Sequence, residues 1–223
     1  YGLVSRYGAV AFASSLDSVG PFGQTVWDCA LALEAIAGHD PGDPTSSNRE
    51  PVSYTKGLAG SVKGLRVGFP REFLEGIAPE VRDEFKRTLK TLENMGIAVE
   101  EISIPSAPYA IDVYYIVATC EASSNLAKFD GVRFGKRAEV ENLDDMYTSS
   151  RGDGLGNEVI RRIMLGTFAL SAGQKETYYV RAAKVRTLIR RDFDKVFEKF
   201  DLIVSPATPY VAFKIGEKID DPL

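Results

Sequence analysis

The clearest hydrophobic pattern lies near the C-terminal end of the sequence. Residues at three- and four-residue spacing share one face of an α-helix, so this pattern predicts an amphipathic helix over 179–200. An apolar run at 201–205, followed by Pro206, predicts a strand directly after the helix. We expect the apolar face of the helix to lie against a sheet. The residues of that face are Ala182, Val185, Ile189, Phe193, Val196 and Phe200.

A second set of patterns predicts a βαβ unit at about 62–105. Residues 65–69 form a short strand-like run, and 97–104 form another. Between them, Pro79 suits the first turn of a helix and Gly96 suits its end. A crossover of this length joins two parallel strands through a right-handed connection. The apolar residues at helical spacing within it are Val81, Phe85, Leu89 and Leu92.

The rest of the chain predicts further helices separated by polar segments. Thr25 suits the N-cap of a helix that ends at Gly38. The apolar run at 9–13 predicts a short buried strand. Together with the βαβ unit, these patterns indicate the α/β class. The remaining predictions are helices at 109–129 and 156–173, a loop at 39–60, and a polar segment interrupted by glycines at 130–155.

Composition narrows the class of protein. Hydrophobic residues make up 44% and charged residues 26% of the chain, as in ordinary globular proteins, so a disordered chain is excluded. A net charge of −4 argues against a basic nucleic-acid coat, and no apolar run reaches the ~18 residues of a membrane span. One histidine and two distant cysteines exclude a two-histidine mechanism, a disulfide scaffold and a zinc knuckle. These features are typical of a reduced, cytoplasmic protein.

Familiar catalytic motifs are absent from the sequence, which has neither a Gly-x-Ser-x-Gly elbow nor a phosphate-binding glycine loop. His39 follows the glycine that ends a predicted helix, so we interpret it as a helix C-terminal residue. Cys29 and Cys120 lie in helical apolar patterns, where free cysteine usually fills the core. The glycine-rich stretch 152–156 is interpreted as a mobile loop or a helix lead-in. The basic run at 181–191 indicates a solvated helix face rather than an RNA contact.

Two pairs of adjacent polar residues within apolar helices are better candidates for a binding site. Arg161 and Arg162 lie near the start of the helix predicted at 156–173. Adjacent helix positions point about 100° apart, so one arginine can face water while the other faces the interior. A buried arginine requires an anionic partner, either a protein carboxylate or a ligand. Tyr114 and Tyr115 form a similar pair, in which one hydroxyl can face a pocket.

Several blocks of the sequence resemble the amidase signature family. The first is GLVSRYG at 2–8 with FASSLD at 12–17. The resemblance covers all 223 residues and implies an α/β segment of a single family domain, with a mixed β-sheet flanked by helices. We expect residues 1–223 to be incomplete at both ends. Within the family, the glutamine-hydrolysing subunits of tRNA-dependent amidotransferases are the most similar, through EASSNLAKFDG at 121–131, RRIMLGTFALSAG at 161–173 and KVRT at 184–187.

The resemblance implies a mechanism and two substrate-binding residues. In the family, the nucleophilic serine of a Ser–Ser–Lys triad attacks the side-chain amide of glutamine. The resemblance places all three residues of the triad upstream of Tyr1, so no catalytic residue is expected in this sequence. Arg162 matches the arginine that binds the α-carboxylate of glutamine, and a guanidinium suits a carboxylate bidentately. Tyr115 matches a tyrosine of the same pocket. Arg161 and Tyr114 are the alternatives if the register differs by one.

The resemblance also implies partners. These are the B and C subunits of the amidotransferase and glutamine itself, with tRNA contacted indirectly through the B subunit. That partner uses ATP and Mg to convert Glu-tRNA(Gln) to Gln-tRNA(Gln) with the released ammonia; no metal or cofactor is expected in this chain. The expected location is cytoplasmic, without a membrane. The chain alone is expected to be inactive. The alternatives are another amidase signature hydrolase of small amides, and a non-catalytic interaction or scaffold module.

Overall fold

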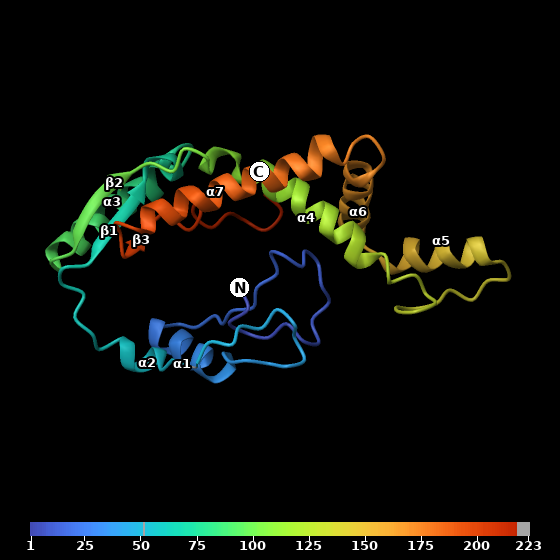
Figure 1. Cartoon of the computed structure of the whole chain (residues 1–223), viewed down its shortest axis with the longest axis horizontal. Helices are drawn as coiled ribbons and strands as arrows, with labels where there is room; N and C mark the ends of the chain where they lie inside the picture. The colour runs from blue at the N-terminus through green and yellow to red at the C-terminus, as the bar shows by residue number, and fades with distance from the viewer. Residues whose placement is uncertain (51, 218–223) are drawn as a thin grey trace. The chain divides into compact units, whose positions relative to one another are not determined.

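The computed structural model describes residues 1–50 and 52–217. The chain forms two compact units, whose elements are labelled in Figure 1. Unit 1 comprises Tyr1–Gly60 and Asp112–Ala183, and unit 2 comprises Ser61–Ile111 and Lys184–Leu223. Within the described part of the chain, no helix combines the length and the apolar character that crossing a bilayer requires.

Unit 2 is built around a three-stranded sheet. Its strands are β1 (Arg66–Pro70), β2 (Ala98–Ile102) and β3 (Leu202–Ile203), in the order β2-β1-β3. Strand β1 pairs in parallel with both of its neighbours, which confirms the predicted βαβ unit and the strand predicted at 201–205. Both strand pairs of this sheet are parallel, and the sheet flanked by helices agrees with the expected α/β class; the mixed sheet that the resemblance implied was that of the whole family domain.

Helix α3 (Pro79–Asn94) connects β1 to β2, and Pro79 is its first residue, as predicted. Its apolar face is directed at the sheet. Phe85 is 7% exposed, and its ring lies edge-on to Phe69 of β1 with the ring centroids 6.1 Å apart. The apolar residues at helical spacing in this segment therefore mark the face of α3 that packs against the sheet.

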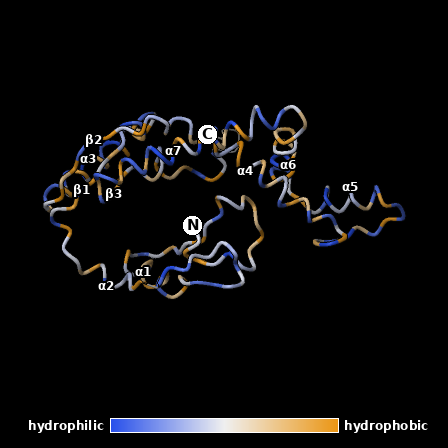
Figure 2. Tube along the Cα trace, in the orientation of Figure 1, coloured by the Kyte–Doolittle hydropathy of each residue, from blue (hydrophilic) through white to orange (hydrophobic). Residues whose placement is uncertain are grey.

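Helix α7 (Arg181–Phe197) confirms the amphipathic helix predicted at 179–200, although it is shorter at both ends. All six residues of the predicted apolar face are buried or half-buried, and most residues between them are exposed. Figure 2 shows the mixture of hydrophilic and hydrophobic positions along this helix. Phe193 lies against Phe73 of the short helix η1 (Arg71–Leu74), with the ring centroids 6.5 Å apart. Asp192 accepts a hydrogen bond from the Ser106 hydroxyl at 2.6 Å, just before η2 (Ala107–Tyr109).

Unit 1 contains helices separated by irregular segments. The first helix begins as predicted, because Thr25 and Asp28 form a capping box at its N-terminus. A π-helical turn, η3 (Glu176–Val180), precedes α7. The helices of this unit are α1 (Val26–Ile36), α2 (Tyr54–Gly57), most of α4 (Ala110–Leu126), α5 (Leu143–Gly154) and α6 (Asn157–Leu170).

Two of these helices were missed by the sequence patterns. Helix α2 lies in the segment 39–60 that was predicted to be a loop. Helix α5 lies in the polar segment 130–155, and Met146 is its one buried residue among those described, so it has almost no apolar periodicity to detect. Its N-cap is Asn142, whose side chain accepts a hydrogen bond from the amide of Asp145 at 2.8 Å.

The strand predicted at 9–13 is wrong. Val10 is 64% exposed, and the segment continues into a turn rather than a ladder. The carboxylate of Asp17 accepts hydrogen bonds from the amides of Phe12 at 2.9 Å and Ala13 at 3.0 Å. A side chain thus satisfies the backbone donors that a neighbouring strand would otherwise have paired.

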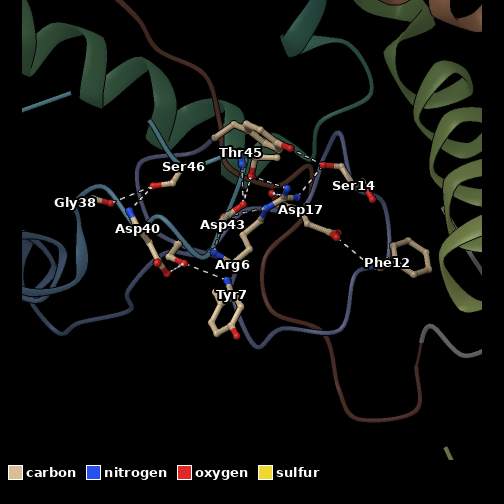
Figure 3. A network of polar contacts seen from close by, with 12 residues as sticks. Arg6, Tyr7, Phe12, Ser14, Asp17, Gly38, Asp40, Asp43, Thr45 and Ser46 are labelled. Atoms are coloured by element: carbon tan, nitrogen blue, oxygen red, sulfur yellow. Dashed lines mark hydrogen bonds and ion pairs between the residues drawn. The ribbon is translucent and has the colours of Figure 1, made fainter. Parts of the chain in front are cut away.

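A polar network holds the irregular N-terminal segment of unit 1 to the loop after α1 (Figure 3). Arg6 donates from Nη1 to the Ser14 carbonyl at 2.7 Å and from Nη2 to Thr45 Oγ1 at 2.8 Å. Asp43, whose side chain is 6% exposed, accepts from the Arg6 amide at 2.9 Å and from the Thr45 hydroxyl at 2.7 Å. These bonds lower the pKa of Asp43 to about 2, the Thr45 hydroxyl contributing most.

Candidate substrate-binding site

The start of α6 carries an ion-pair cluster of three side chains. Glu158 accepts two hydrogen bonds from Arg161, from Nε at 2.8 Å and from Nη2 at 3.1 Å. The same carboxylate accepts from Nε of Arg162 at 2.7 Å. The Arg161 side chain is 58% exposed and that of Arg162 is 26% exposed. The adjacent arginines therefore face different surroundings, as predicted, and Arg162 is the more enclosed.

Two tyrosines of α4 lie beside this cluster. The side chain of Tyr114 lies close to the Arg162 guanidinium and, after Glu158, contributes to the raised pKa of that group. The ring of Tyr115 lies edge-on to that of Tyr114, with the centroids 5.4 Å apart, and Tyr115 lies near Arg161. All four residues singled out from the sequence are thus brought together. The tyrosine close to Arg162 is Tyr114, which was the alternative to Tyr115.

An aromatic ring from the N-terminal segment covers Arg162. The guanidinium carbon lies 5.7 Å from the ring centroid of Phe12, within the range of a cation–π contact. The turn that carries Phe12 is attached to α4, because the Asn125 side chain donates to the Phe12 carbonyl at 3.0 Å. Glu121 of the same helix accepts from the Ser15 amide at 2.8 Å. Helix α4 therefore positions both the tyrosines and the turn.

Helices α4 and α6 cross closely at a glycine. Gly166 is buried, and a Cβ atom added there would lie 1.9 Å from the carbonyl oxygen of Thr119. A hydrogen bond between the hydroxyls of Ser123 and Thr167, 2.8 Å apart, joins the same two helices. Because no side chain separates the backbones, this crossing fixes the tyrosines of α4 beside the arginines of α6.

The electrostatics of the cluster favour an anionic ligand. Hydrogen bonds from Arg161 and then Arg162 lower the pKa of Glu158 to about 2, so this carboxylate is charged at neutral pH. The hydrogen bond to Glu158 in turn raises the pKa of both arginines. Two guanidiniums and one carboxylate leave one positive charge in excess. The cluster can therefore accept one further carboxylate beside the aromatic rings.

The remaining candidates from the sequence lie outside this cluster. His39 is exposed and follows the end of α1, in agreement with its interpretation. Cys120 is 1% exposed, and burial raises the pKa of its thiol, whereas Cys29 is half-buried; both are free. The five cations of the 181–191 run are exposed. The glycine-rich stretch 152–156 is not a loop throughout: Gly152 and Gly154 belong to the last turn of α5, and only Gly156, the N-cap of α6, fits the predicted helix lead-in.

A hollow of about 900 Å³ lies in unit 2, between β2 and α7. Its lining includes Lys195, Lys199 and Glu198 but none of the residues of the arginine cluster. Among the described residues, no group of three or more histidine, cysteine, aspartate or glutamate side chains could hold a metal ion. We therefore place the candidate site at the arginine cluster of unit 1.

Two residues of the candidate site, Glu158 and Phe12, escaped the sequence analysis. Glu158 precedes Arg161 by three positions and Arg162 by four, which is the spacing of ion pairs on a helix, so the signal was present. Phe12 had no such signal. Its place over Arg162 depends on contacts with α4, which is more than 100 residues away in the sequence.

The chain belongs to a known enzyme family. The family model described as Amidase matches residues 1–223, so the chain belongs to the amidase family. It is 56% identical over 225 residues to the A subunit of glutamyl-tRNA(Gln) amidotransferase from Geobacillus sp. (strain WCH70), and 53% identical to the corresponding protein of Desulfatibacillum aliphaticivorans. Each match covers 100% of this chain and 46% of the relative. The chain thus spans about half the length of these curated relatives.

Solved structures show the same likeness. The crystal structure of the glutamyl-tRNA(Gln) amidotransferase A subunit from Thermotoga maritima is 42% identical and superposes with a TM-score of 0.76, over 100% of this chain and 44% of that one. The crystal structure of another amidase is 26% identical, with a TM-score of 0.69 over 98% of this chain and 41% of that one. These neighbours support the α/β architecture with a parallel sheet flanked by helices.

Proposed function

We propose that this protein is the glutamine-hydrolysing component of a tRNA-dependent amidotransferase, and that Arg162 binds the α-carboxylate of glutamine. The observation that carries the proposal is the arginine cluster of unit 1. Arg162 is three-quarters enclosed, contacts Tyr114, and belongs to a group with one positive charge in excess. A guanidinium in such surroundings suits a substrate with one carboxylate. The curated relatives, named as amidotransferase subunits, support the same function.

In this proposal, residues 1–223 bind the substrate, and the hydrolysis of its amide takes place in another part of the full-length protein. Tyr114 and Tyr115 shape the pocket wall, and Phe12 shields the guanidinium from water, which strengthens its interaction with an anion. In this proposal, a Ser–Ser–Lys triad outside residues 1–223 of the full-length protein supplies the nucleophile. Ammonia released there passes to the B subunit, which uses ATP and Mg to amidate Glu-tRNA(Gln); the C subunit completes the complex in the cytoplasm.

The exposed surface supports a longer protein. The chain exposes 15623 Å², whereas a folded protein of 24.4 kDa exposes about 10,000 Å² and two separate units of that total mass about 12,000 Å². Helix α1 illustrates the excess, because it is rich in apolar residues and none of them is fully buried. A helix that is hydrophobic on all sides is usually covered by other protein. The large apolar residues of α1 that are exposed are Val26, Trp27, Leu31 and Ile36.

The experiment that tests this function compares the full-length protein with the isolated chain. The full-length protein, assembled with its B and C partners, is expected to hydrolyse glutamine and to amidate Glu-tRNA(Gln) in the presence of ATP. The 223-residue chain alone is expected to release no ammonia above a buffer blank. Hydrolysis of small aliphatic or aryl amides without dependence on the B partner would instead favour a general amidase. Absence of any amide hydrolysis by the full-length protein would favour a scaffold module.

A further inference from the structure

Glu158 has a geometry that a simple surface ion pair does not require. One carboxylate accepts three hydrogen bonds from two adjacent guanidiniums, using Oε2 for Arg161 and Oε1 for both arginines. Adjacent arginines on a helix point about 100° apart, so a single carboxylate that reaches both restrains both. The side chain of Glu158 is itself 52% exposed, so the ion-pair cluster is accessible from solvent.

The contact leaves part of the Arg162 guanidinium for other partners. Glu158 occupies Nε of Arg162, whereas it holds Arg161 through both Nε and Nη2. Arginine binds a carboxylate through two parallel N–H donors of its planar guanidinium. If the guanidinium is already held in the binding orientation, less side-chain entropy is lost when the ligand binds. The tyrosine contact and the Phe12 ring restrain the same guanidinium from other directions.

We propose that Glu158 is a positioning residue for substrate binding: it orients the Arg162 guanidinium toward the ligand and reduces the charge of the two arginines to that of one cation, which selects a substrate with a single carboxylate. This inference rests on the proposed function, because it assumes that Arg162 binds the α-carboxylate of glutamine. Glu158 acts through Arg162 and does not itself contact the reacting amide.

The test uses the full-length protein in its complex and measures KM and kcat for glutamine. Glu158→Ala is expected to raise KM about 2- to 13-fold, the equivalent of immobilising one long side chain on binding, with kcat nearly unchanged. Glu158→Gln, which retains one acceptor for Arg162 Nε, is expected to fall between wild type and Glu158→Ala. The matched control is Glu80→Gln, because Glu80 is the second residue of α3 as Glu158 is of α6, and this change is expected to leave KM unaltered.

Two further readouts separate a positioning role from a purely structural one. A glutamine analogue that lacks the α-carboxylate should bind equally well to wild type and to Glu158→Ala. The double variant Glu158→Ala/Arg162→Ala should be no worse than Arg162→Ala alone, because the two residues act on one contact. Equal losses for glutamine and the analogue, or additive losses in the double variant, would overturn the inference.

The outcomes also separate this inference from the proposed function. If Arg162→Ala raises KM for glutamine but the Glu158 variants do not, Glu158 only stabilises the helix and the proposed function stands. If Arg162→Ala has no selective effect on glutamine, the proposed function fails at this site. A fall in KM for Glu158→Ala would show that Glu158 competes with the substrate for Arg162, which contradicts positioning.

Discussion

Each of the two units of this chain is stabilised internally by a different kind of interaction. Unit 2 contains a parallel sheet and two amphipathic helices. The faces of these helices that pack can be recognised in the sequence from the regular spacing of apolar residues. Unit 1, which carries the arginine cluster, uses side-chain hydrogen bonds across long loops and one close helix crossing at Gly166. A regular scaffold can therefore be found from periodicity, whereas a binding site built on irregular segments depends on particular contacts between distant residues.

The largest expected effect is at the helix crossing of unit 1. Gly166→Ala places a Cβ atom 1.9 Å from a backbone oxygen, so the helices must separate, and we expect a loss of about 3 kcal/mol or more in the free energy of unfolding. The matched control is Gly152→Ala in α5, where nothing lies within 4 Å of the added atom and alanine should stabilise the helix. Urea unfolding of the full-length protein measures both. Similar stabilities for the two variants would show that the crossing is not close.

The next effect tests the apolar face of α7 in unit 2. Replacing a fully buried phenylalanine by alanine lowers the free energy of unfolding by about 3–5 kcal/mol. Because Phe193 is only half-buried, we expect Phe193→Ala to lower it by about 2–3 kcal/mol. Phe197→Ala, on the same helix but 53% exposed, is the control and should cost less than about 1 kcal/mol. Urea unfolding again provides the measurement. A larger loss at Phe197 would place the wrong face of α7 on the sheet.

These contrasts explain what the sequence could and could not predict. Phe85 and Phe193 were placed correctly because an apolar residue every three or four positions has one physical meaning in a helix. Arg161 and Arg162 were found because paired charges in an apolar helix require partners. The strand predicted at 9–13 was wrong because the Asp17 carboxylate accepts hydrogen bonds from the backbone amides of Phe12 and Ala13. The spacing of apolar residues gives no indication of this contact.

The smallest expected effect concerns the polar network of unit 1. The pKa of Asp43 is about 2 in the folded protein against an ordinary value of 3.8, so the folded state binds this proton less well than the unfolded state. Its stabilising contribution is therefore fully present above about pH 4 and is lost as the pH falls through about 2. The amide chemical shifts of Arg6 and Thr45, which both donate to Asp43, should titrate with a midpoint near pH 2. Asp43→Asn should abolish this titration, and a midpoint near pH 4 would contradict the network.

The most direct test of the central claim compares two nitrogen donors in the assembled complex. Arg162→Ala should lower kcat/KM for glutamine about 10- to 150-fold, as expected for the loss of one charge-assisted hydrogen bond. Arg162→Lys should restore only part of this loss, because an ammonium lacks the planar fork. Free ammonia bypasses the glutamine pocket, so ammonia-dependent amidation should remain near the wild-type rate. Equal impairment of the glutamine- and ammonia-dependent reactions would contradict the account and make Arg162 a structural partner of Glu158.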